Sequence, residues 1–166
     1  KALEQYEAAI ASYQKAIELS PDYRYAHDRL GWVYLLDNQL DNAQQVFDQA
    51  IKVDEQTTSS RFNLGLTYAK QNNLEKAYDL WQQGLTLLTK NEDWSNVTRA
   101  FYTFAIGKIE QGIADMQALI DADVNVEDLE DALGDAEILV TCPQPPDRTE
   151  NMIALLRDAI SKHSVQ

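Results

Sequence analysis

A pattern that repeats with a period of about 34 residues constrains this chain more than any other feature of its sequence. Residues 23–54 and residues 57–88 align so that equivalent positions carry the same kinds of side chain. The aligned pairs are Leu30-Gly31 with Leu64-Gly65, Tyr34 with Tyr68, Leu40 with Leu74, Ala43 with Ala77, and Phe47 with Trp81. A period of this length indicates stacked supersecondary units, none of which can bury its apolar face alone. The sequence therefore predicts a helical array that has no need of a single closed core.

The residue types at these positions indicate how paired helices pack. Gly31 and Gly65 are predicted to lie within helices, where glycine costs about 1 kcal/mol relative to alanine. Close approach of the partner helix would offset that cost, and the small residues Ala43 and Ala77 permit it from the other side. The polar runs at residues 37–39 and 71–73 supply tight turns between the helices of each pair.

This pattern resembles the tetratricopeptide repeat, a unit of two antiparallel helices, A and B. The residues that carry the resemblance are Leu30, Gly31, Tyr34, Ala43, Phe47 and Ala50 in one unit, and Leu64, Gly65, Tyr68, Ala77, Trp81 and Gly84 in the next. The family's large fourth position is here His27 and then Arg61, and its closing proline is Glu55 and then Thr89. The resemblance implies an all-α, right-handed superhelical solenoid of antiparallel helix pairs.

The remaining segments are interpreted as further parts of one solenoid domain spanning residues 1–166. Residues 1–22 are predicted to be the B helix of a truncated repeat, which leads us to expect that the natural chain continues upstream of Lys1. Residues 23–56 and 57–91 form the two well-matched repeats, and residues 92–124 form a degenerate one. Residues 125–166 are predicted to form a C-terminal helix pair that caps the array, because terminal repeats are commonly atypical.

In this family the groove-lining positions are the second, fifth, ninth and twelfth of each repeat, which implies a partner-binding surface on the A helices. The candidate residues are Tyr25, Asp28, Trp32, Leu35, Phe62, Leu66, Trp94, Val97, Phe101 and Phe104, together with Asn63, which takes the sixth position, where the family often holds a backbone-clamping asparagine. Spacings of three and four place each set on one helix face.

Two interpretations of this aromatic stripe stay open at the level of the sequence. It is either an apolar groove for a partner peptide or helix, or a set of side chains buried between neighbouring helices. Periodicity alone does not distinguish them. The resemblance implies a protein-interaction scaffold that binds a partner peptide or helix in its concave groove, as a module of a larger protein. Alternatively, the array self-associates, with its groove filled by its own chain or a second copy, or it is a regulatory domain of an enzyme encoded upstream.

Composition restricts the class of partner. The net charge of −13 and pI near 4.4 argue against nucleic acid or an anionic membrane. Between Lys108 and Arg148 there is no lysine or arginine but there are eleven acidic residues. That segment could steer a basic protein partner, although such runs are more often solvated faces. One cysteine and no long apolar run favour a cytoplasmic protein.

Nothing in the sequence indicates catalysis or a cofactor. The only histidines are His27 and His163, and Cys142 has no neighbouring base, so we expect a small buried thiol. Asp121, Asp123 and Asn125 imitate the start of a calcium loop. Valine and alanine, however, stand where that loop requires glycine and a bidentate acid. The sequence therefore predicts a non-catalytic protein without a metal site.

Overall fold

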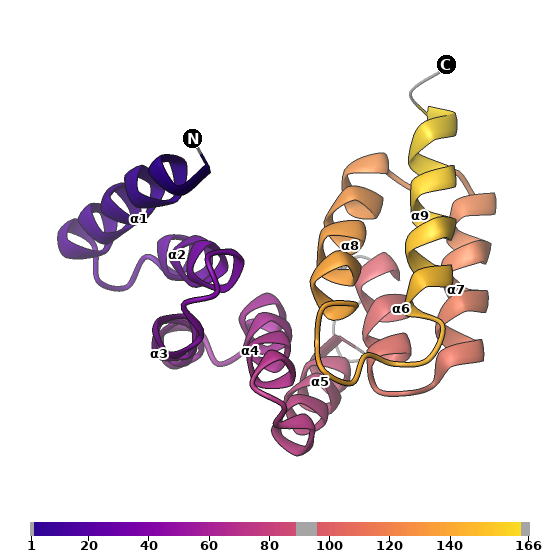
Figure 1. Ribbon diagram of the computed structural model, residues 1–166, viewed down its shortest axis with the longest axis horizontal. Coiled ribbons are helices and arrows are strands. Elements are labelled where there is room, and N and C mark those ends of the chain that lie inside the picture. Colours follow the sequence, from indigo (N-terminus) through magenta and orange to yellow (C-terminus); the bar gives the residue numbers. More distant parts are fainter. Residues whose placement is uncertain (1, 89–95, 164–166) are drawn as a thin grey trace. The chain divides into compact units, whose positions relative to one another are not determined.

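The computed structural model describes residues 2–88 and 96–163, with side chains from residue 5 onward, and every regular element in this part is an α-helix (Figure 1). The helices are α1 (Ala2–Leu19), α2 (Arg24–Leu36), α3 (Leu40–Val53), α4 (Thr58–Lys70), α5 (Leu74–Leu88), α6 (Asn96–Ala105), α7 (Ile109–Asp121), α8 (Val126–Leu139) and α9 (Thr149–His163). The predicted all-α fold of consecutive helix pairs is confirmed. None of the helices in these two ranges combines the length and apolarity that a bilayer span requires.

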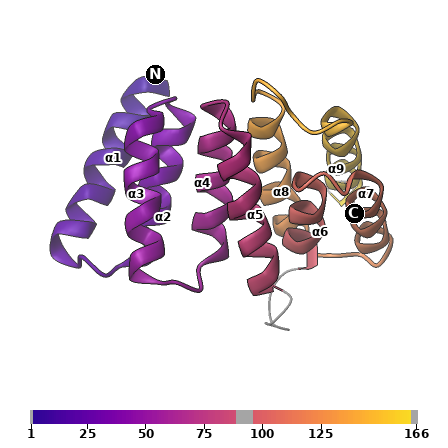
Figure 2. The ribbon, with the colours of Figure 1, turned by 90° about the horizontal axis from the view of Figure 1, so that it is seen from below.

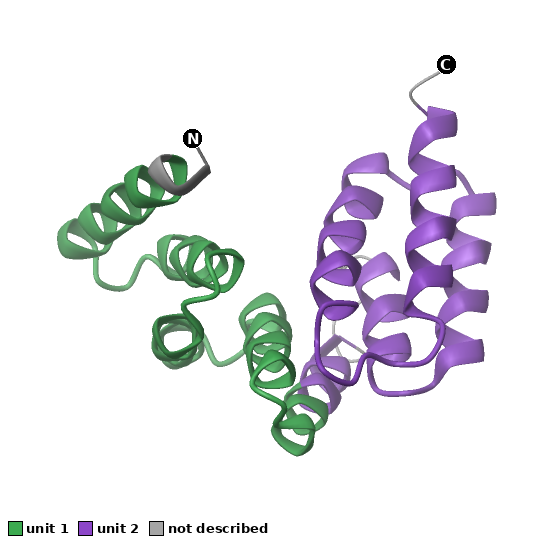
Figure 3. Cartoon of the chain, in the orientation of Figure 1, with its two compact units in different colours: residues 1–80 green, residues 81–166 purple. Residues whose placement is uncertain are grey.

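The chain forms two compact units, Lys1–Leu80 and Trp81–Gln166, and α5 contributes residues to both (Figure 3). In the first unit α2 packs against α1, α3 and α4, and α3 also packs against α4 (Figure 2). In the second unit α6 packs against α7 and α8, while α9 packs against α7 and α8. The helices fall within the segments expected for each repeat, and the exact repeat boundaries stay a prediction.

The turns within the helix pairs share one geometry. Asn38, Asn72 and Gly107 each have positive φ, at 59°, 61° and 88°, directly after α2, α4 and α6. The amide of Gln39 donates to the carbonyl of Tyr34 at 2.8 Å, and equivalent bonds follow α4 and α6. This bonding pattern is a Schellman motif, in which asparagine and glycine tolerate the left-handed residue best. The tight polar turns predicted at residues 37–39 and 71–73 are confirmed.

Close helix contact explains the glycines of the repeat. A Cβ atom built on Gly31 would lie 2.6 Å from the ring of Phe47, which is fully buried between the helices. A Cβ atom on Gly112 of α7 would lie 2.6 Å from the backbone nitrogen of Phe104 in α6. The backbones of these helix pairs can therefore approach only because a side chain is missing there.

The C-terminal helix pair begins and breaks where local signals predict. The side chain of Asn125 caps α8 by accepting a hydrogen bond from the amide of Glu127 at 3.1 Å. Helix α8 ends at Leu139, shortly before the proline-containing segment at residues 143–146. Leu129 of α8 and Leu156 of α9 are fully buried, so the pair has an apolar interface of its own.

Candidate partner-binding surface

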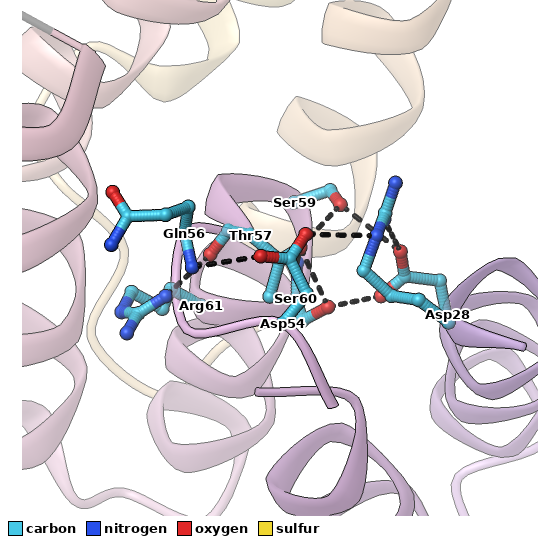
Figure 4. A network of polar contacts seen from close by, with 8 residues as sticks. Asp28, Asp54, Gln56, Thr57, Ser59, Ser60 and Arg61 are labelled. Carbon is cyan, nitrogen blue, oxygen red and sulfur yellow. Dashed lines mark hydrogen bonds and ion pairs between the residues drawn. The ribbon is translucent and has the colours of Figure 1, made fainter. Parts of the chain in front are cut away.

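A polar cluster around Asp28 holds α2 against α4 in the first unit (Figure 4). The Oδ2 atom of Asp28 accepts hydrogen bonds from Arg24 Nη1 at 2.5 Å and from Ser59 Oγ at 3.2 Å. The hydroxyl of Ser60 donates to the other carboxylate oxygen. The Asp28 side chain is only 11% exposed, so these bonds replace the water that its charge would otherwise require.

The loop before α4 completes this cluster. Arg24 Nε also lies 3.2 Å from Asp54, whose other oxygen accepts from the amide of Gln56 at 2.9 Å. The Thr57 side chain caps α4 by accepting from the amide of Ser60. The position of α2 relative to α4 is therefore set by charged hydrogen bonds as well as by apolar packing. Asp28, a candidate groove residue, is engaged within the protein itself.

Most apolar candidates from the sequence lie in the hydrophobic core. Each is 3% exposed or less, and the set comprises Leu35, Phe62, Leu66, Val97, Phe101 and Phe104. Burial assigns these side chains to the packing role that the sequence left open as the alternative to an apolar groove. The reason is that helical spacing identifies a face of a helix but not whether another helix covers it. Trp94 lies outside the described residues.

One face of α2 presents aromatic and basic side chains at the surface. We call Tyr25, Arg29, Trp32 and Leu36 the α2 stripe, because their spacings of four, three and four place them in one row. Tyr25 is 47% and Leu36 43% exposed, Arg29 is exposed, and Trp32 is half-buried. The stripe therefore retains two of the predicted residues, Tyr25 and Trp32.

The outer end of the stripe is ordered by ring contacts. The guanidinium carbon of Arg29 lies 4.9 Å from the centroid of the Tyr25 ring, and the Tyr23 ring lies 6.0 Å from the same ring. A cation over an aromatic face in this range gains about 0.5–1 kcal/mol at an exposed site. The sequence analysis missed Arg29 and Leu36 as candidates. Their spacing could have identified them, because Arg29 follows Tyr25, and Leu36 follows Trp32, by one helical turn on the same face.

Asn63, the predicted clamp residue, lies half-buried on α4. It stands one repeat period after Arg29 and therefore occupies the same repeat position as the basic residue of the α2 stripe. The two A helices of the first unit thus present different polar groups at equivalent places.

The acidic segment of the second unit is partly neutralised by arginines that follow it. Arg148 pairs with Glu110 at 2.5 Å, and Arg157 of α9 pairs with Glu137 of α8 at 2.7 Å. Burial, and secondarily the charge of Asp131, raises the pKa of Asp135 well above its ordinary value. Steering of a basic partner by this segment stays a prediction.

The groups considered for catalysis serve structural roles in the described part of the chain. Cys142 is 5% exposed and its thiol donates to the carbonyl of Ile138 at 3.7 Å, as expected for a buried thiol. His27 is buried, with its Nε2 atom 2.7 Å from the carbonyl oxygen of Pro21.

Comparison with known protein families identifies the repeat. The family described as TPR repeat matches residues 1–37, and the family described as Tetratricopeptide repeat matches residues 29–87. Residues 1–87 of this chain belong to the tetratricopeptide repeat family. No match was found among curated proteins.

Solved structures extend the likeness of fold to nearly the whole chain. The chain is similar to a tetratricopeptide repeat protein from Parabacteroides merdae ATCC 43184, with 17% identity and a TM-score of 0.54, over 93% of this chain and 66% of that one. It is also similar to MamA, with 15% identity and a TM-score of 0.50, over 97% of this chain and 92% of that one. The chain thus spans just under two thirds of the Parabacteroides protein. At these identities the likeness concerns the fold alone.

Proposed function

We propose that this chain is a non-catalytic protein-interaction scaffold that binds an amphipathic helix of a partner protein on the α2 stripe. The tetratricopeptide repeats support an interaction scaffold in general. The observation that carries the particular surface is the row of Tyr25, Arg29 and Leu36, which are exposed, with the half-buried Trp32 on one face of α2. Trp, Tyr and Arg are the residues most enriched among those that dominate binding energy at protein interfaces.

The Asp28 cluster supports this assignment because it holds the helix that carries the stripe. Three donors on α2 and α4 bind the Asp28 carboxylate, so α2 is already ordered before any partner arrives. A surface that is ordered in the free protein loses less conformational entropy on binding. Binding energy from the aromatic side chains is therefore not offset by a large entropic cost of ordering α2.

The equivalent face of α4 favours a helix as the occupant. Ser59 and Leu66 stand one repeat period after Tyr25 and Trp32. Ser59 hydrogen-bonds to Asp28 on α2, and Leu66 is fully buried, so this face of α4 packs on another helix. A partner helix could cover the α2 stripe in the same manner. Arg29 indicates that such a helix carries a carboxylate near one end of its apolar face.

Selection from a display library of helical peptides, followed by affinity measurements on single variants, tests this proposal. The selected peptides are measured by fluorescence anisotropy against the full chain and its Trp32→Ala and Arg29→Glu variants. We expect each variant to bind at least tenfold more weakly. The control variant is Leu19→Ser. Leu19 lies on α1, outside the α2 stripe, and its apolar side chain is 77% exposed.

Circular dichroism establishes whether each variant is folded. If Trp32→Ala does not fold, the surface charge variant Arg29→Glu still tests the proposal. Unchanged affinity in both folded variants would refute the surface. Concentration-dependent dimers in sedimentation that disappear in Arg29→Glu would instead assign the stripe to a second copy of the chain.

A further inference from the structure

A second surface of the first unit is hollowed between α1 and α3. This groove has a volume of about 760 Å³. Its floor is apolar and takes one residue from each of three helices, Ile17 of α1, Leu30 of α2 and Val46 of α3. Leu30 and Trp32 point roughly 200° apart around the α2 axis, so the groove and the α2 stripe are separate surfaces.

His27 of α2 is one of the polar residues that line the groove. Its imidazole lines the groove, and its Nε2 atom is held 2.7 Å from the carbonyl oxygen of Pro21 in the segment that joins α1 to α2. The hydrogen bond ties the ring to that segment, so the side chain borders the hollow without filling it.

The wall formed by α3 carries a carboxylate that lacks a direct partner. Asp48 is half-buried, and within the described residues it forms neither a hydrogen bond nor an ion pair at contact distance. Burial raises the pKa of Asp48 above its ordinary 3.8, although the charges of Lys52, which also lines the groove, and of Lys76 act in the opposite direction. A carboxylate in this state would be stabilised by a cation placed inside the groove.

The wall formed by α1 adds a second carboxylate. Glu18 lines the groove and pairs with Lys15 at 2.9 Å, but both side chains are 66% exposed. Ion pairs between exposed side chains contribute at most about 1 kcal/mol and exchange partners readily. One carboxylate from α1 and one from α3 thus line the same groove as the apolar side chains.

Glutamine side chains along the rim suit the backbone of a bound peptide. Gln45 and Gln49 stand one helical turn apart on α3, and Gln14 stands on α1. Each amide side chain can both donate and accept a hydrogen bond, as the peptide backbone does. The amide of Gln14 already donates to the hydroxyl of Tyr34 at 3.1 Å, which leaves its carbonyl oxygen to accept from a ligand.

We propose that the groove between α1 and α3 binds an extended peptide segment with an apolar side chain on its floor and an adjacent lysine or arginine between Glu18 and Asp48. The volume lies within the roughly 300–1,000 Å³ typical of sites that enclose a small ligand or a few side chains. A simple polyamine would satisfy the carboxylates but would leave the half-buried side chains of Ile17 and Val46 in contact with water. This site does not depend on the function proposed for the α2 stripe.

The test uses the peptide acetyl-Gly-Leu-Lys-Leu-Gly-amide and the full chain labelled with ¹⁵N. We expect a saturable shift of the amide resonances of Gln45 and Gln49 in two-dimensional NMR spectra. The analogue with glutamate in place of lysine should bind at least tenfold more weakly, and so should spermidine. Asp48→Asn should weaken binding of the lysine peptide at least fivefold. The control is Glu75→Gln, an exposed carboxylate on α5 that does not line the groove.

Acidification provides a second readout. Protonation of Asp48 removes the negative charge that the lysine of the peptide meets, so affinity should fall as the pH is lowered. The other titratable or charged groups that line the groove or act on Asp48 are Glu18 of α1, His27 of α2, Lys52 of α3 and Lys76 of α5. We therefore expect the pH dependence to be reduced in Asp48→Asn.

Three results would overturn the site. They are equal binding of the lysine and glutamate peptides, resonance shifts confined to the α2 stripe, and unchanged affinity of folded Asp48→Asn. Dimers of the chain that disappear in Asp48→Asn would likewise contradict a peptide ligand, because they would place a second copy in the groove.

Discussion

Substitution of Gly112 and Gly134 by alanine separates the two effects that govern glycine in a packed helix. Both residues lie in helices of the second unit, Gly112 in α7 and Gly134 in α8. A Cβ atom on Gly112 would lie 2.6 Å from both the backbone nitrogen and the Cβ atom of Phe104, whereas one on Gly134 would meet no atom within 4 Å. The same chemical change therefore tests close packing in one case and helix propensity alone in the other.

The magnitudes decide the sign of each effect. Replacing glycine by alanine inside a helix gains up to about 1 kcal/mol, and Gly134→Ala should realise that gain. Gly112→Ala adds an overpacking cost of about 1–3 kcal/mol. The upper part of that range applies because the clash is with backbone, which cannot rotate away as a side chain can. Since the overpacking cost exceeds the gain in helix propensity, we expect Gly112→Ala to lose about 2 kcal/mol of unfolding free energy.

Urea unfolding and thermal unfolding, both followed by circular dichroism at matched protein concentration, measure the two variants. For a unit of roughly 60–100 residues, about 1 kcal/mol corresponds to a change in Tm of about 4–8 °C, so the two variants should shift Tm in opposite directions. Equal stabilisation of Gly112→Ala and Gly134→Ala would refute this reasoning, because it would show that close contact between α6 and α7 does not require glycine at position 112.

Two further predictions concern polar contacts. Asp28→Ala removes the carboxylate that accepts hydrogen bonds from Ser60 and Arg24, which should lower the unfolding free energy by about 1–3 kcal/mol in urea titration. Ser59→Ala removes only an exposed donor to the same carboxylate and should lower the unfolding free energy less. A hydrogen bond to the carbonyl of Ala159, followed by contact with Asp123, raises the pKa of His163 above 6.5. Its contribution to stability should thus be full below pH 6.5 and be lost as the pH rises through the folded pKa. An NMR titration in which Asp123→Asn leaves the His163 pKa unchanged would contradict this assignment.

Much of the fold was accessible from the repeat period. The period located Leu30-Gly31 and Leu64-Gly65 within A helices and Phe47 against them, and the close contact of Gly31 with Phe47 bears this out. Turn chemistry was equally local, since Asn38 and Asn72 take the left-handed conformation that ends a helix. Such features depend on residues within one repeat, and the repeat is visible in the order of the chain.

The candidate surface was predictable only in part. Tyr25 and Trp32 keep surface exposure, whereas Phe62 and Phe101, at equivalent kinds of position, are buried. Whether a side chain on a given helix face reaches solvent depends on which other helix lies over that face.

The order of residues in this chain was enough to establish that it forms paired helices, where they turn, and which residues each helix face carries. Only the folded structure showed that Asp28 accepts hydrogen bonds from α4, that Arg29 lies over the ring of Tyr25, and that a groove lies between α1 and α3. The physical reason is that helix formation follows from local spacing, whereas exposure and pairing arise between segments that the fold brings together.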